Sequence, residues 1–310
     1  MAPYNILSLD GGGIRGVLTI RLIERLEQMV PGWLNRIDLF AGTSTGGILA
    51  LALAAGLSPT YVREIYEKLG QDVFADTIWD DIKDAGKLLG ADYALEPLHR
   101  MFIEHLGDIT LGDLQKRVLI STFDLDDEGS QPGKPRSWKA KFFHNYPGPD
   151  SDAQARVADV GVMTSAAPTY FPIYQGYIDG GVVATNPSMC ALAQALHKGT
   201  GRQRLGDIRL FSMGTGHNAQ HIASTDGDWG LAQWSQHLVD LMLDGGQGLA
   251  DYQCRQILGR RYHRLNPSLD RNVGMDAVKA IPYLLQVADL QNLDETAEWL
   301  RSRLQPAPAV

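Results

Sequence analysis

Two glycine-rich turns that directly follow short apolar runs constrain the fold most strongly. The run YNILSL (4–9) is followed by DGGG, and the run IDLFA (37–41) is followed by GTSTG. A segment with helical spacing of apolar residues follows the first turn (14–30), and a helix of small residues follows the second (45–55). Each run, with its turn and the segment after it, therefore predicts a strand that passes through a tight turn into a helix, as in α/β proteins.

The rest of the chain continues this alternation. We expect further strands at 117–125, 139–146, 177–180 and 207–216, and helices at 58–69, 153–165 and 187–198. Near-continuous apolar strands that alternate with helices indicate a mostly parallel sheet covered on both faces, hence a three-layer α/β/α fold. The chain beyond about Trp229 is predicted to be mostly helical. We expect a main domain over 1–225 and a helical part over 226–310 that packs on the same domain.

Composition excludes several classes of protein. The 310 residues include 44% hydrophobic residues and carry a net charge of −8, which disfavours a nucleic-acid partner and simple electrostatic adhesion to anionic lipid. Cys190 and Cys254 can form no disulfide framework and lack metal-ligand spacing. The start has no basic segment before an apolar one, and the longest apolar run (48–57) is about half of the roughly 20 residues of a membrane span. We expect a soluble, cytoplasmic protein.

The first turn, DGGGIRG, allows three interpretations. Gly11, Gly13 and Gly16 match the G-x-G-x-x-G pattern of dinucleotide-binding proteins. That pattern expects an acid at the end of the second strand, where this chain has AGTSTGG, and Asp10 would place a carboxylate beside a pyrophosphate. A purely structural turn is the second interpretation. The third is a site for an oxyanion, because consecutive glycines beside a helix start expose backbone N–H groups.

The second turn matches G-x-S-x-G with Ser44 at its apex. Strand, sharp turn and helix are the context in which this pattern presents a nucleophilic serine. The start of the following helix favours negative charge, which would help an attacking alkoxide. A phosphate-binding loop or a packing loop is the alternative, but neither explains a serine at the apex.

A serine nucleophile needs a base, and two candidates follow strands. Asp179 ends the strand in GYIDGG, where two glycines allow close approach, although an ordinary Asp-Gly turn has the same pattern. His217 follows the glycines of a later strand, so the order Ser44, Asp179, His217 would mimic an α/β-hydrolase triad. That fold places its nucleophile after several strands, however, and here Ser44 follows the second. A dyad and a triad both stay open on these residues alone.

Five ordered segments together resemble the patatin-like phospholipases. They are DGGGIRG, GTSTGG, MTSAAPTYFP (163–172), YIDGGVVATNP and LFSMGTG (210–216), and the resemblance covers roughly 4–70 and 155–216. It implies a patatin-like catalytic domain over 1–225 with a serine–aspartate dyad, in which Ser44 is the nucleophile and Asp179 is the base. It also implies that Gly11, Gly12 and Gly13 supply the N–H groups of an oxyanion hole. Arg15 would orient the glycine loop or contact a lipid phosphate.

The resemblance implies a lipid acyl hydrolase of the phospholipase A type that cleaves fatty-acyl esters of glycerophospholipids. Such a hydrolase needs no metal or organic cofactor. It would touch a membrane surface transiently while it binds a phospholipid or another lipid ester. A carboxylesterase for soluble esters and a non-hydrolytic nucleotide-binding module are the alternatives. The segment 71–90 spaces Phe74, Ile78 and Ile82 four apart, which predicts either an amphipathic lid or a helix that covers the core.

Overall fold

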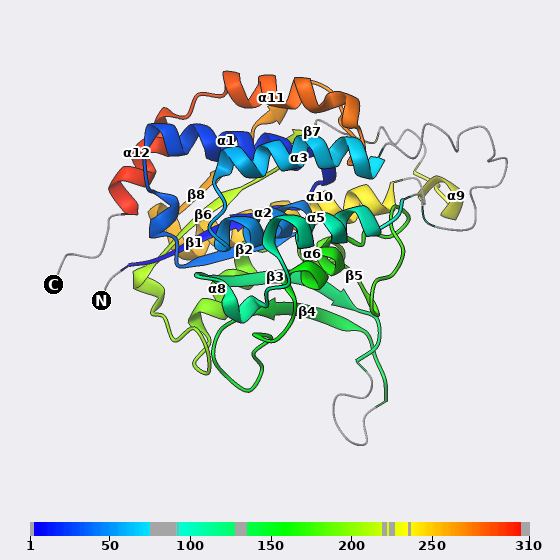
Figure 1. The fold of residues 1–310 in the computed structure, drawn as a ribbon. Coiled ribbons are helices and arrows are strands. Elements are labelled where there is room, and N and C mark those ends of the chain that lie inside the picture. The colour runs from blue at the N-terminus through cyan, green and yellow to red at the C-terminus, as the bar shows by residue number, and fades with distance from the viewer. Residues whose placement is uncertain are drawn as a thin grey trace.

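A computed structural model describes residues 3–74, 91, 93–127, 135–218, 222, 227–234 and 237–304. Within this part of the chain, a seven-stranded sheet has the order β4-β3-β2-β1-β6-β8, and β5 pairs with β3 (Figure 1). The strands are β1 (Tyr4–Leu9), β2 (Leu39–Thr43), β3 (Arg117–Asp124), β4 (Lys139–His144), β5 (Tyr177–Asp179), β6 (Ile208–Met213) and β8 (Tyr262–Leu265). The pairs β1–β2, β1–β6, β2–β3 and β6–β8 are parallel, and β4 and β5 run antiparallel to β3. The predicted mostly parallel sheet is confirmed.

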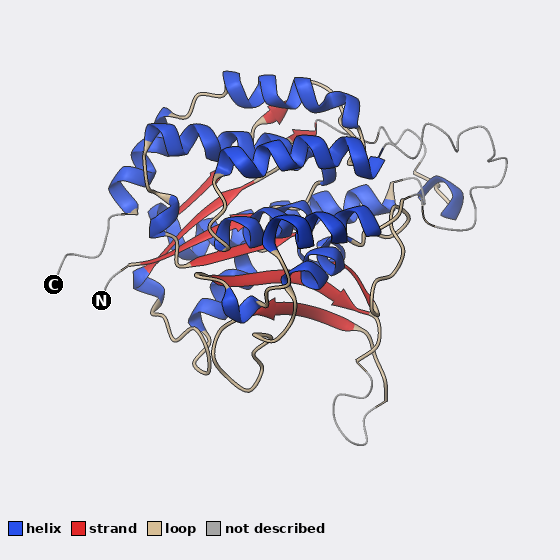
Figure 2. Cartoon of the chain, viewed as in Figure 1, coloured by secondary structure: helices blue, strands red, loops and turns tan. Residues whose placement is uncertain are grey.

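Helices cover both faces of this sheet, as Figure 2 shows. One face carries α1 (Gly16–Met29), α2 (Thr45–Ala54), α3 (Pro59–Phe74), α5 (Glu96–Leu106), α6 (Val157–Ser165), α11 (Ile281–Leu290) and α12 (Asp294–Arg303). The other face carries α8 (Ser188–Leu196) and α10 (Leu238–Leu258), and the short helices α7 (Gly181–Ala184) and α9 (Leu231–Trp234) complete the described helices. The predicted three-layer α/β/α fold is therefore confirmed.

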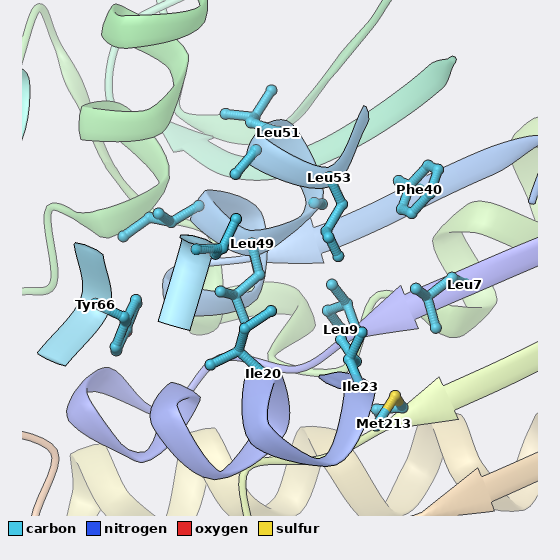
Figure 3. Packing of buried hydrophobic residues seen from close by; sticks show 14 of the residues in the cluster. Leu7, Leu9, Ile20, Ile23, Phe40, Leu49, Leu51, Leu53, Tyr66 and Met213 are labelled. Carbon is cyan, nitrogen blue, oxygen red and sulfur yellow. The ribbon is translucent and has the colours of Figure 1, made fainter. Parts of the chain in front are cut away.

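The alternation of side chains along the strands creates two separate cores. Leu7 and Leu9 of β1 pack with Ile20 and Ile23 of α1 in the larger core (Figure 3), whereas Ile6 of the same strand belongs to the smaller core under α8 and α10. Successive residues of a strand point to opposite faces, so a strand buried on both sides is mostly apolar. This explains the composition of β1 and β2, in which Asn5, Ser8 and Thr43 are the polar members.

The chain beyond residue 226 contributes to the same sheet. All four residues of β8 pair with residues of β6. β9 (Ser268–Leu269) pairs with β7 (His217–Asn218) outside the main sheet. β8 and β9 lie in the part predicted to be mostly helical. β8, of sequence YHRL, was missed because four residues with two polar members carry almost no periodicity. The domain boundary at 225 stays a prediction.

Two further expectations concern membranes. In the described ranges, none of the helices combines the length and apolar character needed to cross a bilayer. The predicted lid at 71–90 begins at the end of α3, but residues 75–90 lie outside the described residues.

Candidate active site

The carboxyl ends of neighbouring strands bring the two glycine-rich turns together. In the parallel pair β1–β2, Leu9 lies opposite Gly42, so the turns that follow these strands share one edge of the sheet. Asp179 ends β5 and pairs with Thr122 near the carboxyl end of β3. A pocket opens among these loops. It is lined by Gly11, Gly12, Arg15, Ser44, Ala167, Pro168, Asp179, Gly181, Val182, Thr185, Gln247 and Met275.

The turn at Ser44 is as tight as the sequence pattern predicts. Ser44 has φ 54° and ψ −127°, a conformation that side-chain-bearing residues rarely adopt and that costs on the order of 1–3 kcal/mol. The flanking glycines are required sterically: a Cβ atom at Gly42 would collide with the Gly46 carbonyl, and one at Gly46 would collide with the Leu9 carbonyl. The segment 42–46 is called the serine elbow below.

A chain of hydrogen bonds holds the backbone of the serine elbow in place. The Ser44 N–H donates to Thr164 Oγ1 at 2.9 Å, and the Thr164 hydroxyl donates to the Ser121 carbonyl at 2.6 Å. Ser44 also stands at the N-cap of α2, where the helix dipole favours negative charge. The backbone is therefore held while the side-chain hydroxyl lines the pocket.

Asp179 lines the same pocket as this hydroxyl and is almost fully buried. The residue is 4% exposed, and burial raises the pKa of its carboxyl to about 7. The neighbouring Ser44 hydroxyl and the hydrogen bond from the Gly181 N–H (2.7 Å) lower the pKa by less than burial raises it. A carboxylate with a pKa near neutrality can both accept and return a proton, as a general base must.

Three side chains hold the carbonyls of residues 11–13, called the glycine loop below. Thr215 Oγ1 donates to the Gly11 carbonyl at 3.0 Å, and Arg15 Nε donates to the Gly12 carbonyl at 3.3 Å. The Tyr66 hydroxyl donates to the Gly13 carbonyl at 2.9 Å. All three carbonyls of the loop are thus fixed by side-chain donors.

These anchors also set the direction of the N–H groups. A peptide group is planar and trans, so the N–H of one residue points opposite to the carbonyl of the residue before it. Fixing the carbonyls of Gly11 and Gly12 therefore fixes the N–H groups of Gly12 and Gly13, and neither N–H has a hydrogen-bond partner among the described residues. The Gly11 N–H donates to the Thr185 carbonyl at 2.9 Å. Two of the three predicted donors are available as the loop stands.

A buried ion pair anchors the start of the glycine loop. Arg264 of β8 contacts the fully buried Asp10 with Nη2–Oδ2 at 2.6 Å, and it also donates to Ser212 Oγ at 2.7 Å. Burial lowers the pKa of the Arg264 guanidinium, but the Asp10 carboxylate outweighs this effect and raises that pKa above its ordinary value. The Ile14 N–H, at the other end of the loop, donates to the Met275 carbonyl at 2.7 Å. The C-terminal part of the chain therefore holds the loop at both ends.

The predicted candidates separate into two groups in space. Ser44, Asp179, Gly11, Gly12 and Arg15 line one pocket, and Gly13 continues the loop. Arg15 is 6% exposed and donates to the Gly12 carbonyl, and its role in orienting the loop stays a prediction. Contact of Arg15 with a lipid phosphate stays a prediction.

His217 lies elsewhere. It is exposed in β7, its N–H donates to the Pro267 carbonyl at 2.8 Å, and it is absent from the pocket lining.

Several residues of the site had no sequence signal. Gln247 and Met275 line the pocket, and Thr215, Tyr66 and Arg264 hold the glycine loop. Thr215 lies in the LFSMGTG segment, but nothing in that motif names its partner. In the described part of the chain, no group of three or more His, Cys, Asp or Glu residues is arranged to hold a metal ion.

Comparison with known proteins identifies the family of this chain. The model of the patatin-like phospholipase family matches residues 7–192, more than half of the chain, and the chain belongs to that family. Membership supports a lipid-hydrolysing activity on ester bonds.

Relatives match over most of their length. The chain is similar to CotR of Bacillus subtilis (strain 168), with 28% identity over 97% of this chain and 98% of that protein. It is also similar to a cGAMP-activated phospholipase of Pseudomonas aeruginosa (strain BWHPSA011 / Pa011), with 29% identity over 90% of this chain and 82% of that protein. Among solved structures, VipD from Legionella pneumophila matches 92% of this chain and 67% of its own, at 12% identity and a TM-score of 0.38.

Proposed function

We propose that this chain is a phospholipase A-type hydrolase that cleaves fatty-acyl esters of glycerophospholipids, with Ser44 as nucleophile and Asp179 as general base. One observation carries the proposal: a serine hydroxyl at a strained elbow lines the same pocket as a buried carboxyl whose pKa burial raises to about 7. Each group supplies what the other lacks. Ser44 needs a proton acceptor, and Asp179 is basic enough near neutral pH to serve as one.

The acylation half would proceed within the pocket. The Asp179 carboxylate accepts the Ser44 proton while Oγ attacks the acyl carbonyl carbon, and the carbonyl oxygen becomes an oxyanion. The N–H groups of Gly12 and Gly13 are the candidate donors to this oxyanion. As the tetrahedral intermediate collapses, the protonated Asp179 returns its proton to the leaving alcohol, which leaves the acyl group on Ser44.

The deacylation half repeats these steps with water. Asp179 accepts a proton from a water molecule that attacks the acyl carbonyl, and the same N–H groups stabilise the second oxyanion. Collapse of this intermediate breaks the bond to Ser44 Oγ, and Asp179 returns the proton to the serine. The products are a fatty acid and the regenerated enzyme.

The pocket favours an acyl chain over a nucleotide. Ala167, Pro168, Val182 and Met275 give it an apolar wall that suits hydrocarbon. A dinucleotide site would need the glycine-loop amides for phosphates, yet the Gly11 N–H is taken by Thr185. The phospholipid assignment, in place of a soluble ester, rests on family membership, and a membrane surface would present the substrate.

Labelling with a serine-directed fluorophosphonate tests the nucleophile. The wild-type chain should react covalently, and Ser44→Ala should take no label. Ser302→Ala is the matched control, because Ser302 is exposed on α12 and distant in sequence from the site. Label that persists in Ser44→Ala would contradict the assignment of the nucleophile.

A substrate comparison tests the class of ester. Purified wild-type chain should release fatty acid from phosphatidylcholine vesicles, and Ser44→Ala should not. Hydrolysis of a short-chain soluble ester without any release from phospholipid would instead identify a carboxylesterase.

A further inference from the structure

One of the buried residues that line the pocket carries a polar side-chain amide. Gln247 of α10 is 7% exposed and lines the same pocket as Ser44 and Asp179. Its backbone carbonyl accepts a hydrogen bond from Asn186 Nδ2 at 3.4 Å, but its side-chain amide has no hydrogen-bond partner among the described residues. The amide atoms are not fully enclosed, so they meet the pocket space, where a ligand can supply the missing hydrogen bond.

Packing alone does not explain a glutamine at this position. Gln247, Ala250, Cys254 and Leu258 are all buried and recur at the spacing of one helix face. The last three are apolar, and Cys254 and Leu258 belong to the smaller core, so Gln247 is the polar member of an otherwise apolar stripe. It also lies between Gly246 and Gly248, which carry no side chains of their own.

The Thr185 side chain, another polar group in the pocket lining, already donates a hydrogen bond within the protein. The Thr185 hydroxyl donates to the Gly181 carbonyl at 3.0 Å. Gln247 therefore adds a hydrogen-bonding capacity that this wall otherwise lacks, and a ligand that enters the pocket can satisfy it.

We propose that the Gln247 amide binds an oxygen in the alcohol half of the ester substrate, which makes it a specificity-determining residue. This inference rests on the proposed function. The acyl half offers nothing to an amide beyond the scissile carbonyl, and that oxygen belongs to the glycine loop. The alcohol half of a glycerophospholipid carries a second ester and a phosphodiester, whose oxygens accept hydrogen bonds from an amide N–H.

The test compares two substrates that share one acyl chain. One is phosphatidylcholine, and the other is the 1-naphthyl ester of the same fatty acid, whose alcohol half carries no oxygen beyond the ester; both are presented in the same detergent micelles. Gln247→Met keeps the volume and removes the amide. The ratio of kcat/KM for phosphatidylcholine to kcat/KM for the naphthyl ester should fall about tenfold to a hundredfold in this variant.

Controls separate this effect from damage to the fold. Gln256→Met is matched, because Gln256 is exposed on the same helix, and it should leave the ratio at the wild-type value. If Gln247→Met does not fold, Gln247→Asn, which keeps the amide but shortens its reach, is measured in the same way. A second readout is inhibition of naphthyl-ester hydrolysis by glycerophosphocholine, the free alcohol half, which should weaken in the Gln247 variant.

The outcomes are distinct. An unchanged ratio, or an equal loss on both esters, would overturn the role of Gln247 while leaving the hydrolase itself intact. A wild-type chain that cleaves the naphthyl ester and not phosphatidylcholine would overturn the phospholipase proposal. A wild-type chain that cleaves neither would overturn the hydrolase, and the inference with it.

Discussion

The serine elbow and the glycine loop lie at the ends of neighbouring parallel strands, yet different parts of the chain hold them in place. The elbow depends on Gly42 and Gly46, which are two residues from Ser44 on either side. The glycine loop depends on Thr215, Arg264 and the Met275 carbonyl, all more than 200 residues away in sequence. Asp179 is also held by a residue close in sequence, since its carboxylate accepts a hydrogen bond from the Gly181 N–H.

This difference separates what each part contributes. The elbow and Asp179 bring together the groups that exchange a proton, and near neighbours (Gly42, Gly46 and Gly181) help to place them beside the more distant Thr164 hydroxyl. The glycine loop supplies backbone N–H groups, which carry no side chain of their own and must be aimed by contacts from elsewhere. Changes at the elbow or the base should therefore abolish turnover, whereas changes to the anchors of the loop should lower it by degrees.

The largest effect is expected for Asp179→Asn. An amide cannot accept the Ser44 proton, so phospholipid hydrolysis should fall by about 10⁴-fold or more. The variant should stay folded, because the asparagine oxygen can still accept from the Gly181 N–H. Fatty-acid release and circular dichroism together measure both points. Activity within about tenfold of wild type, in a folded variant, would remove Asp179 from the role of base.

A side chain in the glycine loop should have the next largest effect. A Cβ at Gly12 would collide with the Thr215 side chain, so Gly12→Ala must displace the backbone and its N–H. Loss of one oxyanion donor typically costs about 10²–10³ in kcat. Gly245→Ala is the matched control, because that exposed glycine of α10 has open space where a Cβ would stand. Near-normal kcat in a folded Gly12→Ala protein would show that the loop has another role.

Removing an anchor of the loop should have a smaller effect. Thr215→Val keeps the shape but leaves the Gly11 carbonyl without its donor, so the Gly12 N–H is aimed less well. We expect kcat to fall about tenfold with little change in KM, since the interaction matters only when the oxyanion forms. Thr215→Ser restores the hydroxyl and should recover most of the loss. A change in KM alone, or no rescue by serine, would make Thr215 a packing residue.

The same contrast explains what the sequence could reveal. The elbow follows from local rules, because only glycine fits at Gly42 and Gly46, and the fold follows from apolar strands that alternate with helices. Gln247 and Arg264 carried no signal, since a glutamine in a helix and an arginine in a four-residue strand are ordinary until the chain is folded. Their roles depend on pocket and ion-pair geometry that no short motif encodes.

The raised pKa of Asp179 predicts an effect on stability, separate from those on turnover. A carboxyl whose pKa rises from 3.8 to about 7 on folding binds its proton more tightly in the folded state. Its contribution to stability is therefore full below about pH 3.8 and is lost as pH rises through about 7. Asp179→Asn carries no such charge, so its stability relative to wild type should increase between pH 4.5 and pH 8, on the order of 3 kcal/mol.

Urea unfolding of both proteins at the two pH values measures this difference. The comparison between variant and wild type cancels the titration of the other carboxyls, which both proteins share. A difference that does not change between pH 4.5 and pH 8 would mean that Asp179 is not the buried, proton-binding group that the pocket geometry indicates.

The smallest effect is expected for His217→Ala, which separates the dyad from the triad. His217 is exposed, lies outside the pocket lining and contributes its backbone N–H to the Pro267 carbonyl, a bond that alanine keeps. Asp179 faces Ser44 directly, so no imidazole is needed between them. Turnover of phosphatidylcholine should stay within about twofold of wild type, because a side chain outside the site contributes little to the barrier. In a triad, loss of the histidine would cost several orders of magnitude. A folded His217→Ala protein with such a loss would mean that the proton leaves Ser44 by another route.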